Sequence, residues 1–178
     1  MLIPRQPVPG LTLETLDNGS FDLAADGAGF ATLVVFYRGL HCPICATYLK
    51  ELGRLTPDFA EKGVKTIAIS SDGKERAQQM ADKVAQPDLR FGYDLSLQVA
   101  RDWGLFISTS RGTTSIGIEE PALFSEPGVF LVKADGTLYF SSVQTMPFVR
   151  PHFQEMVGAL DFVQKNDYPA RGEYTGAV

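Results

Sequence analysis

The segment Phe36-Tyr37-Arg38-Gly39-Leu40-His41-Cys42-Pro43-Ile44-Cys45 contains both cysteines of the 178-residue chain. It overlaps the end of a continuous apolar, β-branched run from Ala31 to Tyr37, which predicts a buried central strand of the kind found in parallel sheets. Pro43 stands where the first residue of a helix is expected, and proline is favoured there because its missing N–H would have no partner. The segment therefore predicts a strand, a tight turn and a helix that begins beside Cys42.

The two cysteines, Cys42 and Cys45, are three residues apart, so on a helix their side chains share one face. Residues with this spacing are close enough for a disulfide, so the pair predicts reversible oxidation. Cys42 would lie at the helix N-terminus, where free N–H groups and the helix dipole stabilise a thiolate. Cys45 would lie on the apolar face, where burial raises the pKa of a thiol. We therefore expect Cys42 to attack and Cys45 to resolve.

Two residues near Cys42 could affect its reactivity, and one alternative would leave the cysteines unreactive. Arg38 would bring positive charge to the reactive sulfur, but it fits equally a surface residue at a strand end. His41 could tune the thiolate, and it fits slightly better a packed spacer at the loop tip. Inert packing of two free cysteines would explain Cys45, but it explains poorly a cysteine at a helix start followed by Pro43.

No cofactor or metal is predicted. Tetrahedral zinc needs four ligands, and the chain has only two cysteines and two histidines, of which His41 is poorly placed beside Cys42. Covalent haem attachment needs a histidine directly after the second cysteine, and Ala46 is there instead.

Apolar periodicity and turn signals extend this pattern in both directions. We expect a hairpin of residues 11–16 and 21–23 around Asp17-Asn18-Gly19-Ser20, strands at 64–70 and 89–91, a second hairpin of 129–132 and 137–141, helices after Cys42, at 77–84, 95–103 and 149–163, and a long connection at 104–128. Pro57 predicts either a kink in the first helix or a second short segment capped by Thr56. The predicted class is α/β, with the layout of a thioredoxin-like fold: a mixed, mostly parallel central sheet flanked by helices, with an N-terminal β-hairpin extension.

Composition restricts the partners and the location. The net charge is −5, which gives neither the basic footprint that binds nucleic acid nor a basic membrane patch. The most apolar stretch, residues 30–37, is too short to span a bilayer, and residues 1–10 lack the layout of a signal peptide. We expect a cytoplasmic protein with one domain over residues 1–178 and short extended ends at about 1–8 and 166–178.

The quoted segment resembles the active-site segment of the peroxiredoxin-like branch of the alkyl hydroperoxide reductase/thiol-specific antioxidant (AhpC/TSA) family, in the thioredoxin-like superfamily. Residues 67–72, 94–106 and 128–137 resemble further family segments in the same order, so the resemblance covers about residues 8–165. It implies a thiol peroxidase in which the Cys42 thiolate attacks peroxide and becomes a sulfenic acid. Cys45 would then close an intramolecular disulfide, which an external thiol such as a thioredoxin or glutathione system would reduce. The resemblance also makes a homodimer plausible.

The chain departs from the typical family pattern at three positions. Family members carry proline seven residues and threonine three residues before the reactive cysteine, and here Val35 and Gly39 stand there. The family's arginine before the "gly-leu-phe" strand is replaced by Pro127, and Arg38 is a candidate substitute. Thioredoxin-like oxidoreductases have a cis-proline at that place, so we expect a cis Glu126–Pro127 bond packed near the cysteines.

Three functions follow from these features. The first is a peroxide reductase, the second is a thioredoxin-like oxidoreductase that acts on protein disulfides, and the third is a non-catalytic redox sensor. Peroxide consumption would support the first, and reduction of protein disulfides would support the second.

Overall fold

The computed structural model describes residues 1–178, which form four α-helices and nine strands. In chain order the elements are β1 (Thr12–Glu14), β2 (Ser20–Asp22), a 3₁₀ turn (Leu23–Ala25), β3 (Ala31–Phe36), α1 (Pro43–Glu61), β4 (Val64–Ile69), α2 (Lys74–Val84), β5 (Arg90–Gly92), α3 (Leu97–Asp102), β6 (Ile107–Thr109), β7 (Leu123–Ser125), β8 (Gly128–Lys133), β9 (Leu138–Val143) and α4 (Phe153–Lys165). None of the helices combines the length and the apolar character that crossing a bilayer requires.

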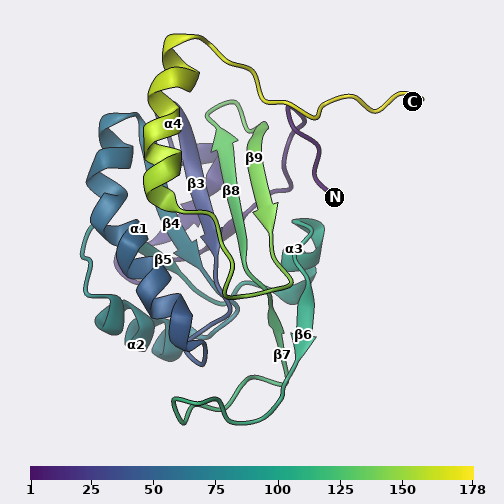
Figure 1. Ribbon diagram of the computed structural model, residues 1–178. Coiled ribbons are helices and arrows are strands. Elements are labelled where there is room, and N and C mark those ends of the chain that lie inside the picture. The colour runs from purple at the N-terminus through teal and green to yellow at the C-terminus, as the bar shows by residue number, and fades with distance from the viewer.

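A five-stranded sheet in the order β5-β4-β3-β8-β9 forms the centre of the molecule (Figure 1). β3 pairs in parallel with β4, and β4 pairs in parallel with β5. β8 is antiparallel to both of its neighbours, β3 and β9, so β8 alone runs against the other four strands. The predicted α/β class, with a mixed, mostly parallel sheet and an N-terminal hairpin formed by β1 and β2, is therefore confirmed.

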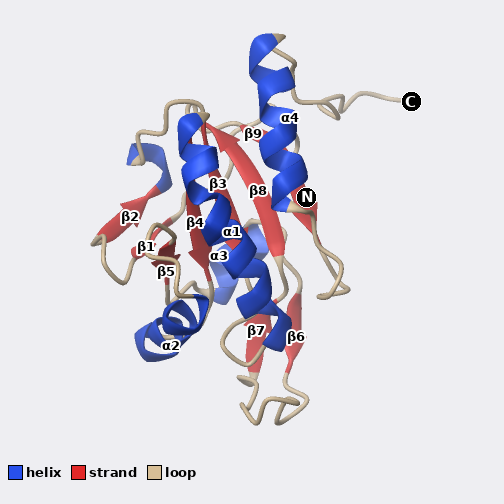
Figure 2. Cartoon of the chain, turned by 60° about the vertical axis from the view of Figure 1, so that its left-hand side comes forward, coloured by secondary structure: helices blue, strands red, loops and turns tan.

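Strand β3 is buried along its whole length because the sheet is covered on both faces. Leu33 and Val35 pack in the same cluster as the buried residues of α1 and α4, which lie on one side of the sheet in Figure 2. Val34 and Phe36 point to the opposite face, where the Phe36 ring meets Trp103 edge-on with centroids 5.4 Å apart. A strand with two buried faces needs a continuous apolar run rather than alternation, and that is the pattern of residues 31–36.

Helix α1 is continuous despite its internal proline. Pro57 lies in its last two turns, and the helix runs on to Glu61 without a second segment. The Thr56 hydroxyl donates a hydrogen bond to the Leu52 carbonyl at 3.1 Å, so Thr56 bonds backward into the helix and does not cap a new one. Gly63, at φ +69°, then turns the chain into β4.

The region predicted as a long connection, residues 104–128, contains a further pair of strands. β6 and β7 pair antiparallel and extend beyond one end of the central sheet (Figure 1). The sequence does not predict this hairpin, because each strand has only three residues and most of their side chains are not buried. Such short strands in a Gly- and Ser-rich segment give no clear apolar alternation.

The prediction of a cis bond before Pro127 is wrong, because every peptide bond in the chain is trans. Only Glu126 and Pro127 separate the end of β7 from the start of β8. The Glu126 N–H donates to the Phe106 carbonyl at 2.7 Å, and Gly128 already pairs with Phe36 in the central sheet. The backbone therefore continues from one extended strand into the next without a reversal.

Candidate active site

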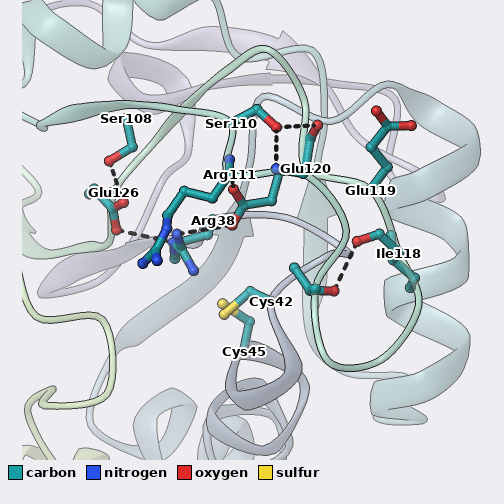
Figure 3. Close-up of polar contacts among 12 residues, drawn as sticks. Arg38, Cys42, Cys45, Ser108, Ser110, Arg111, Ile118, Glu119, Glu120 and Glu126 are labelled. Atoms are coloured by element: carbon teal, nitrogen blue, oxygen red, sulfur yellow. Dashed lines mark hydrogen bonds and ion pairs between the residues drawn. The ribbon is translucent and has the colours of Figure 1, made fainter.

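The two cysteines occupy the first turn of α1, directly after the end of β3. Cys42 is the N-cap residue, Pro43 follows it at the first helical position, and the Cys42 N–H donates to the Gly39 carbonyl at 3.1 Å. Both thiols are reduced and buried, with 1% of Cys42 and none of Cys45 exposed. Figure 3 shows the two sulfur atoms together at the start of the helix. The spacing therefore places both side chains on one face, as the sequence predicts.

The side chain that contacts both sulfurs is Arg150, which the sequence analysis did not identify. One of its guanidinium nitrogens, Nη2, lies 3.2 Å from Cys45 Sγ and 3.7 Å from Cys42 Sγ. Arg150 belongs to the connection between β9 and α4, where its Nε donates to the Pro147 carbonyl at 2.6 Å. Its guanidinium carbon also lies 5.0 Å from the centre of the Tyr48 ring. No local motif marks this arginine, because more than a hundred residues separate it from the cysteines.

These contacts make the two thiols chemically different. A hydrogen bond from Cys45 lowers the pKa of Cys42 to about 6, against the opposing effect of burial and with help from Arg150 and more weakly from Arg38. Burial raises the pKa of Cys45 well above its ordinary value, and the neighbouring Cys42 raises it further. At neutral pH the pair therefore holds a thiolate at Cys42 and a proton at Cys45.

Arg38 lies close to the site, but its guanidinium is held by two buried carboxylates. Its Nε is 3.1 Å from Glu126 and its Nη2 is 3.5 Å from Glu120 (Figure 3). Glu126 also accepts a 2.6 Å hydrogen bond from the Ser108 hydroxyl, and the guanidinium lies over the Phe124 ring. Arg38 is therefore neither a free surface residue nor a direct contact of a sulfur. It ties the end of β3 to the β6–β7 hairpin.

His41 is fully buried and carries no charge at neutral pH. Its ring packs edge-on against Phe124 with centroids 4.6 Å apart, and neither ring nitrogen has a hydrogen-bond partner. Burial, together with the charge of Arg38, lowers the pKa of His41 to about 4. The residue acts as a packed spacer rather than as a source of positive charge for Cys42.

Gly39 adopts a backbone conformation that favours glycine, with φ +135°. A Cβ atom at this position would lie 2.7 Å from Oδ2 of Asp72, which is closer than van der Waals contact allows. The threonine that typical family members carry here would therefore not fit. A side chain at position 39 would require both the backbone and the Asp72 carboxylate to move.

Pro127 is buried between β7 and β8, and its carbonyl accepts a 3.1 Å hydrogen bond from the Gln144 N–H. It therefore holds the end of β9, from which the chain continues towards Arg150. The chain has no group of three or more His, Cys, Asp or Glu side chains arranged to hold a metal ion.

A known protein family covers most of this chain. The model of the AhpC/TSA family matches residues 4–141. No curated protein sequence matches the chain.

Several solved structures share the fold at low sequence identity. A cysteine variant of peroxiredoxin 6 from Arenicola marina has a TM-score of 0.76 at 18% identity, covering 94% of this chain and 76% of that one. AhpC from Enterococcus faecalis has a TM-score of 0.72 at 16% identity, covering 94% and 97%. The yeast mitochondrial 1-Cys peroxiredoxin, whose thiol resolution is described as proceeding via glutathione/thioredoxin systems, has a TM-score of 0.74 at 16% identity, covering 94% and 78%.

The fold is thus the thioredoxin-like fold of the peroxiredoxins, and the chain belongs to the AhpC/TSA family. Membership of this family makes the protein a thiol-dependent oxidoreductase.

Proposed function

We propose that this protein is a thiol peroxidase in which Cys42 attacks the peroxide and Cys45 resolves the product as an intramolecular disulfide. The observation that carries the proposal is the position of Arg150, whose guanidinium contacts both sulfurs while the pKa of Cys42 is lowered to about 6. Only the thiolate is nucleophilic, so this arrangement supplies an attacking group at neutral pH.

The reaction proceeds in two steps within the chain. The Cys42 sulfur attacks one peroxide oxygen, the O–O bond breaks, and the other oxygen takes a proton and leaves as water or an alcohol. The Cys45 sulfur then attacks the sulfenic sulfur of Cys42, the S–O bond breaks, and the hydroxyl leaves as water with the Cys45 proton. The resulting disulfide is reduced by two electrons from an external thiol, and a thioredoxin or glutathione system is the proposed donor.

The burial of both sulfurs favours a small substrate. With 1% of Cys42 and none of Cys45 exposed, a protein disulfide would need a rearrangement to reach either sulfur, whereas a peroxide is only a few atoms wide. The trans bond before Pro127 also removes the argument for a thioredoxin-like site. Peroxide reduction is therefore the better supported of the two reactions.

The test is a Cys45→Ser variant treated with one equivalent of hydrogen peroxide. Serine keeps a hydroxyl that can donate to the Cys42 thiolate, so the attack should proceed while resolution is blocked. We expect a dimedone-reactive sulfenic acid at Cys42, detected by mass spectrometry, at a rate well above that of free cysteine. Because the hydroxyl replaces a fully buried thiol, folding is first verified by circular dichroism.

A Cys42→Ser variant is the matched control and should give no dimedone adduct. If the folded Cys45→Ser protein reacts with peroxide no faster than free cysteine, yet captures protein disulfides as mixed adducts, the oxidoreductase function replaces the peroxidase.

A further inference from the structure

The turn that precedes Cys42 is held by a buried carboxylate from another part of the chain. Asp72 follows β4 in the loop before α2, and only 1% of its side chain is exposed. Its Oδ2 accepts a hydrogen bond of 2.7 Å from the backbone N–H of Leu40. Leu40 lies within the four-residue turn that the bond from the Cys42 N–H to the Gly39 carbonyl closes. The carboxylate therefore contacts the backbone two residues before the attacking cysteine.

The absence of a side chain at Gly39 makes this contact possible. A Cβ there would lie 2.7 Å from Asp72 Oδ2 and 3.0 Å from Oδ1, in the space that the carboxylate occupies. Gly39 and Asp72 are therefore complementary, since one leaves the room that the other fills.

The carboxylate is itself held in position. Its other oxygen, Oδ1, lies 3.2 Å from Nε of Arg76, in the first turn of α2. The Arg76 guanidinium also donates to the carbonyl of Glu119 at 3.2 and 3.3 Å. The next residue along, Glu120, pairs with Arg38 at the end of β3. These contacts connect Asp72 through Arg76, the Glu119–Glu120 segment and Arg38 back to the turn. Among them, the bond from Asp72 is the one that reaches the backbone of the turn itself.

Asp72 is retained at an energetic cost. Burial raises the pKa of Asp72, against the opposing effects of the Leu40 N–H and Arg76, so the charged form is disfavoured relative to the unfolded chain. A buried charged group of this kind contributes little net stability, so the hydrogen bond to the turn is the role that the contacts support.

We propose that Asp72 is a positioning residue that holds the Gly39–Cys42 turn so that the Cys42 sulfur stays within reach of Arg150 and the Cys45 thiol. Without the carboxylate the turn can relax, and the Cys42 thiolate loses part of the hydrogen bonding that stabilises it. This inference rests on the proposed function only in taking Cys42 as the attacking thiol.

The test measures iodoacetamide alkylation of Cys42 against pH in folded variants, which needs no peroxide. Asp72→Ala should move the midpoint to higher pH and slow alkylation at pH 6 about fivefold, as a rise of about one pH unit in the midpoint would do. Asp72→Asn keeps an oxygen that accepts from Leu40, so it should restore most of the rate. Asp82→Asn removes an exposed carboxylate from α2, the helix that follows Asp72, and should match the wild type.

Gly39→Ala tests the same contact from the other side and remains available if Asp72→Ala does not fold. It should shift the midpoint in the same direction. Because alanine at φ +135° also strains the backbone whatever the space, the contact with Asp72 is measured by the part of the shift that disappears when Asp72→Ala is added. A wild-type midpoint in folded Asp72→Ala or Gly39→Ala would overturn the proposal. A shifted midpoint in a protein that consumes no peroxide would instead overturn the peroxidase function and leave the role of Asp72 intact.

Discussion

Arg150 shows at the scale of one residue how a partly buried charge is kept in this fold. Burial lowers the pKa of Arg150, but Cys45 and Cys42 raise it by more, so the guanidinium and the thiolate stabilise each other. Its Nη1 is buried without a hydrogen-bond partner, and none of the ion pairs in the chain includes Arg150. The cysteine pair is therefore the anionic partner of this arginine.

We expect Arg150→Met to raise the pKa of Cys42, because the variant removes the positive charge and the hydrogen bonds to the sulfurs. Alkylation of Cys42 at pH 7 should slow about tenfold, since only the thiolate reacts. The measurement is the rate of iodoacetamide alkylation between pH 5 and 9. Arg101→Met removes an exposed arginine from α3, on the opposite face of the sheet from α1, and should leave the profile unchanged. An unchanged profile in Arg150→Met would show that Arg150 does not stabilise the thiolate.

At the scale of an element, two helical glycines differ in what surrounds them. A Cβ added to Gly53 of α1 would lie 2.3 Å from Cβ of Gln86, just after the end of α2, so the two segments are in close contact there. A Cβ added to Gly158 of α4 would meet nothing within 4 Å. The first glycine permits close packing between segments, whereas the second only weakens its helix.

These two glycines predict opposite effects of the same substitution. Gly158→Ala should raise the free energy of unfolding by about 1 kcal/mol, because alanine favours the helix. Gly53→Ala should lower it by about 1–3 kcal/mol, because overpacking outweighs that gain. Urea unfolding followed by circular dichroism measures both. A Gly53→Ala protein as stable as Gly158→Ala would contradict the close packing at Gly53.

At the scale of the whole molecule, the buried histidine links stability to pH. The pKa of His41 is lowered from 6.5 to about 4 in the folded protein, so between these values the unfolded chain binds more protons. The stability that the neutral ring provides is complete above pH 6.5 and is lost as pH falls towards 4. The shift corresponds to roughly 3 kcal/mol.

We expect His41→Phe to reduce this dependence, because phenylalanine keeps the packing against Phe124 and cannot take up a proton. Urea unfolding at pH 4 to 7 should show a smaller loss of stability in the variant than in the wild type. His152→Gln replaces the chain's other histidine, which is exposed at the start of α4, and should retain the wild-type dependence. Equal slopes in all three proteins would rule out His41 as the titrating group.

The sequence by itself determined the features that depend on neighbouring residues. The continuous apolar run of β3 predicted a buried strand, Pro43 predicted the start of α1, and the spacing of Cys42 and Cys45 predicted a shared helix face. Each of these is a local property, because strand burial, helix initiation and side-chain direction follow from a few consecutive residues.

Only the tertiary structure decided which distant groups surround the cysteines. Arg150 reaches them from the connection before α4, Asp72 reaches their turn from the loop after β4, and Glu120 and Glu126 hold Arg38 from the β6–β7 hairpin. A single arginine or aspartate in a loop carries no periodic signal, and its role depends on which strand ends meet at one edge of the sheet. The same limit explains why the sequence wrongly predicts a cis bond before Pro127, since the path of the chain from β7 into β8 decides that bond.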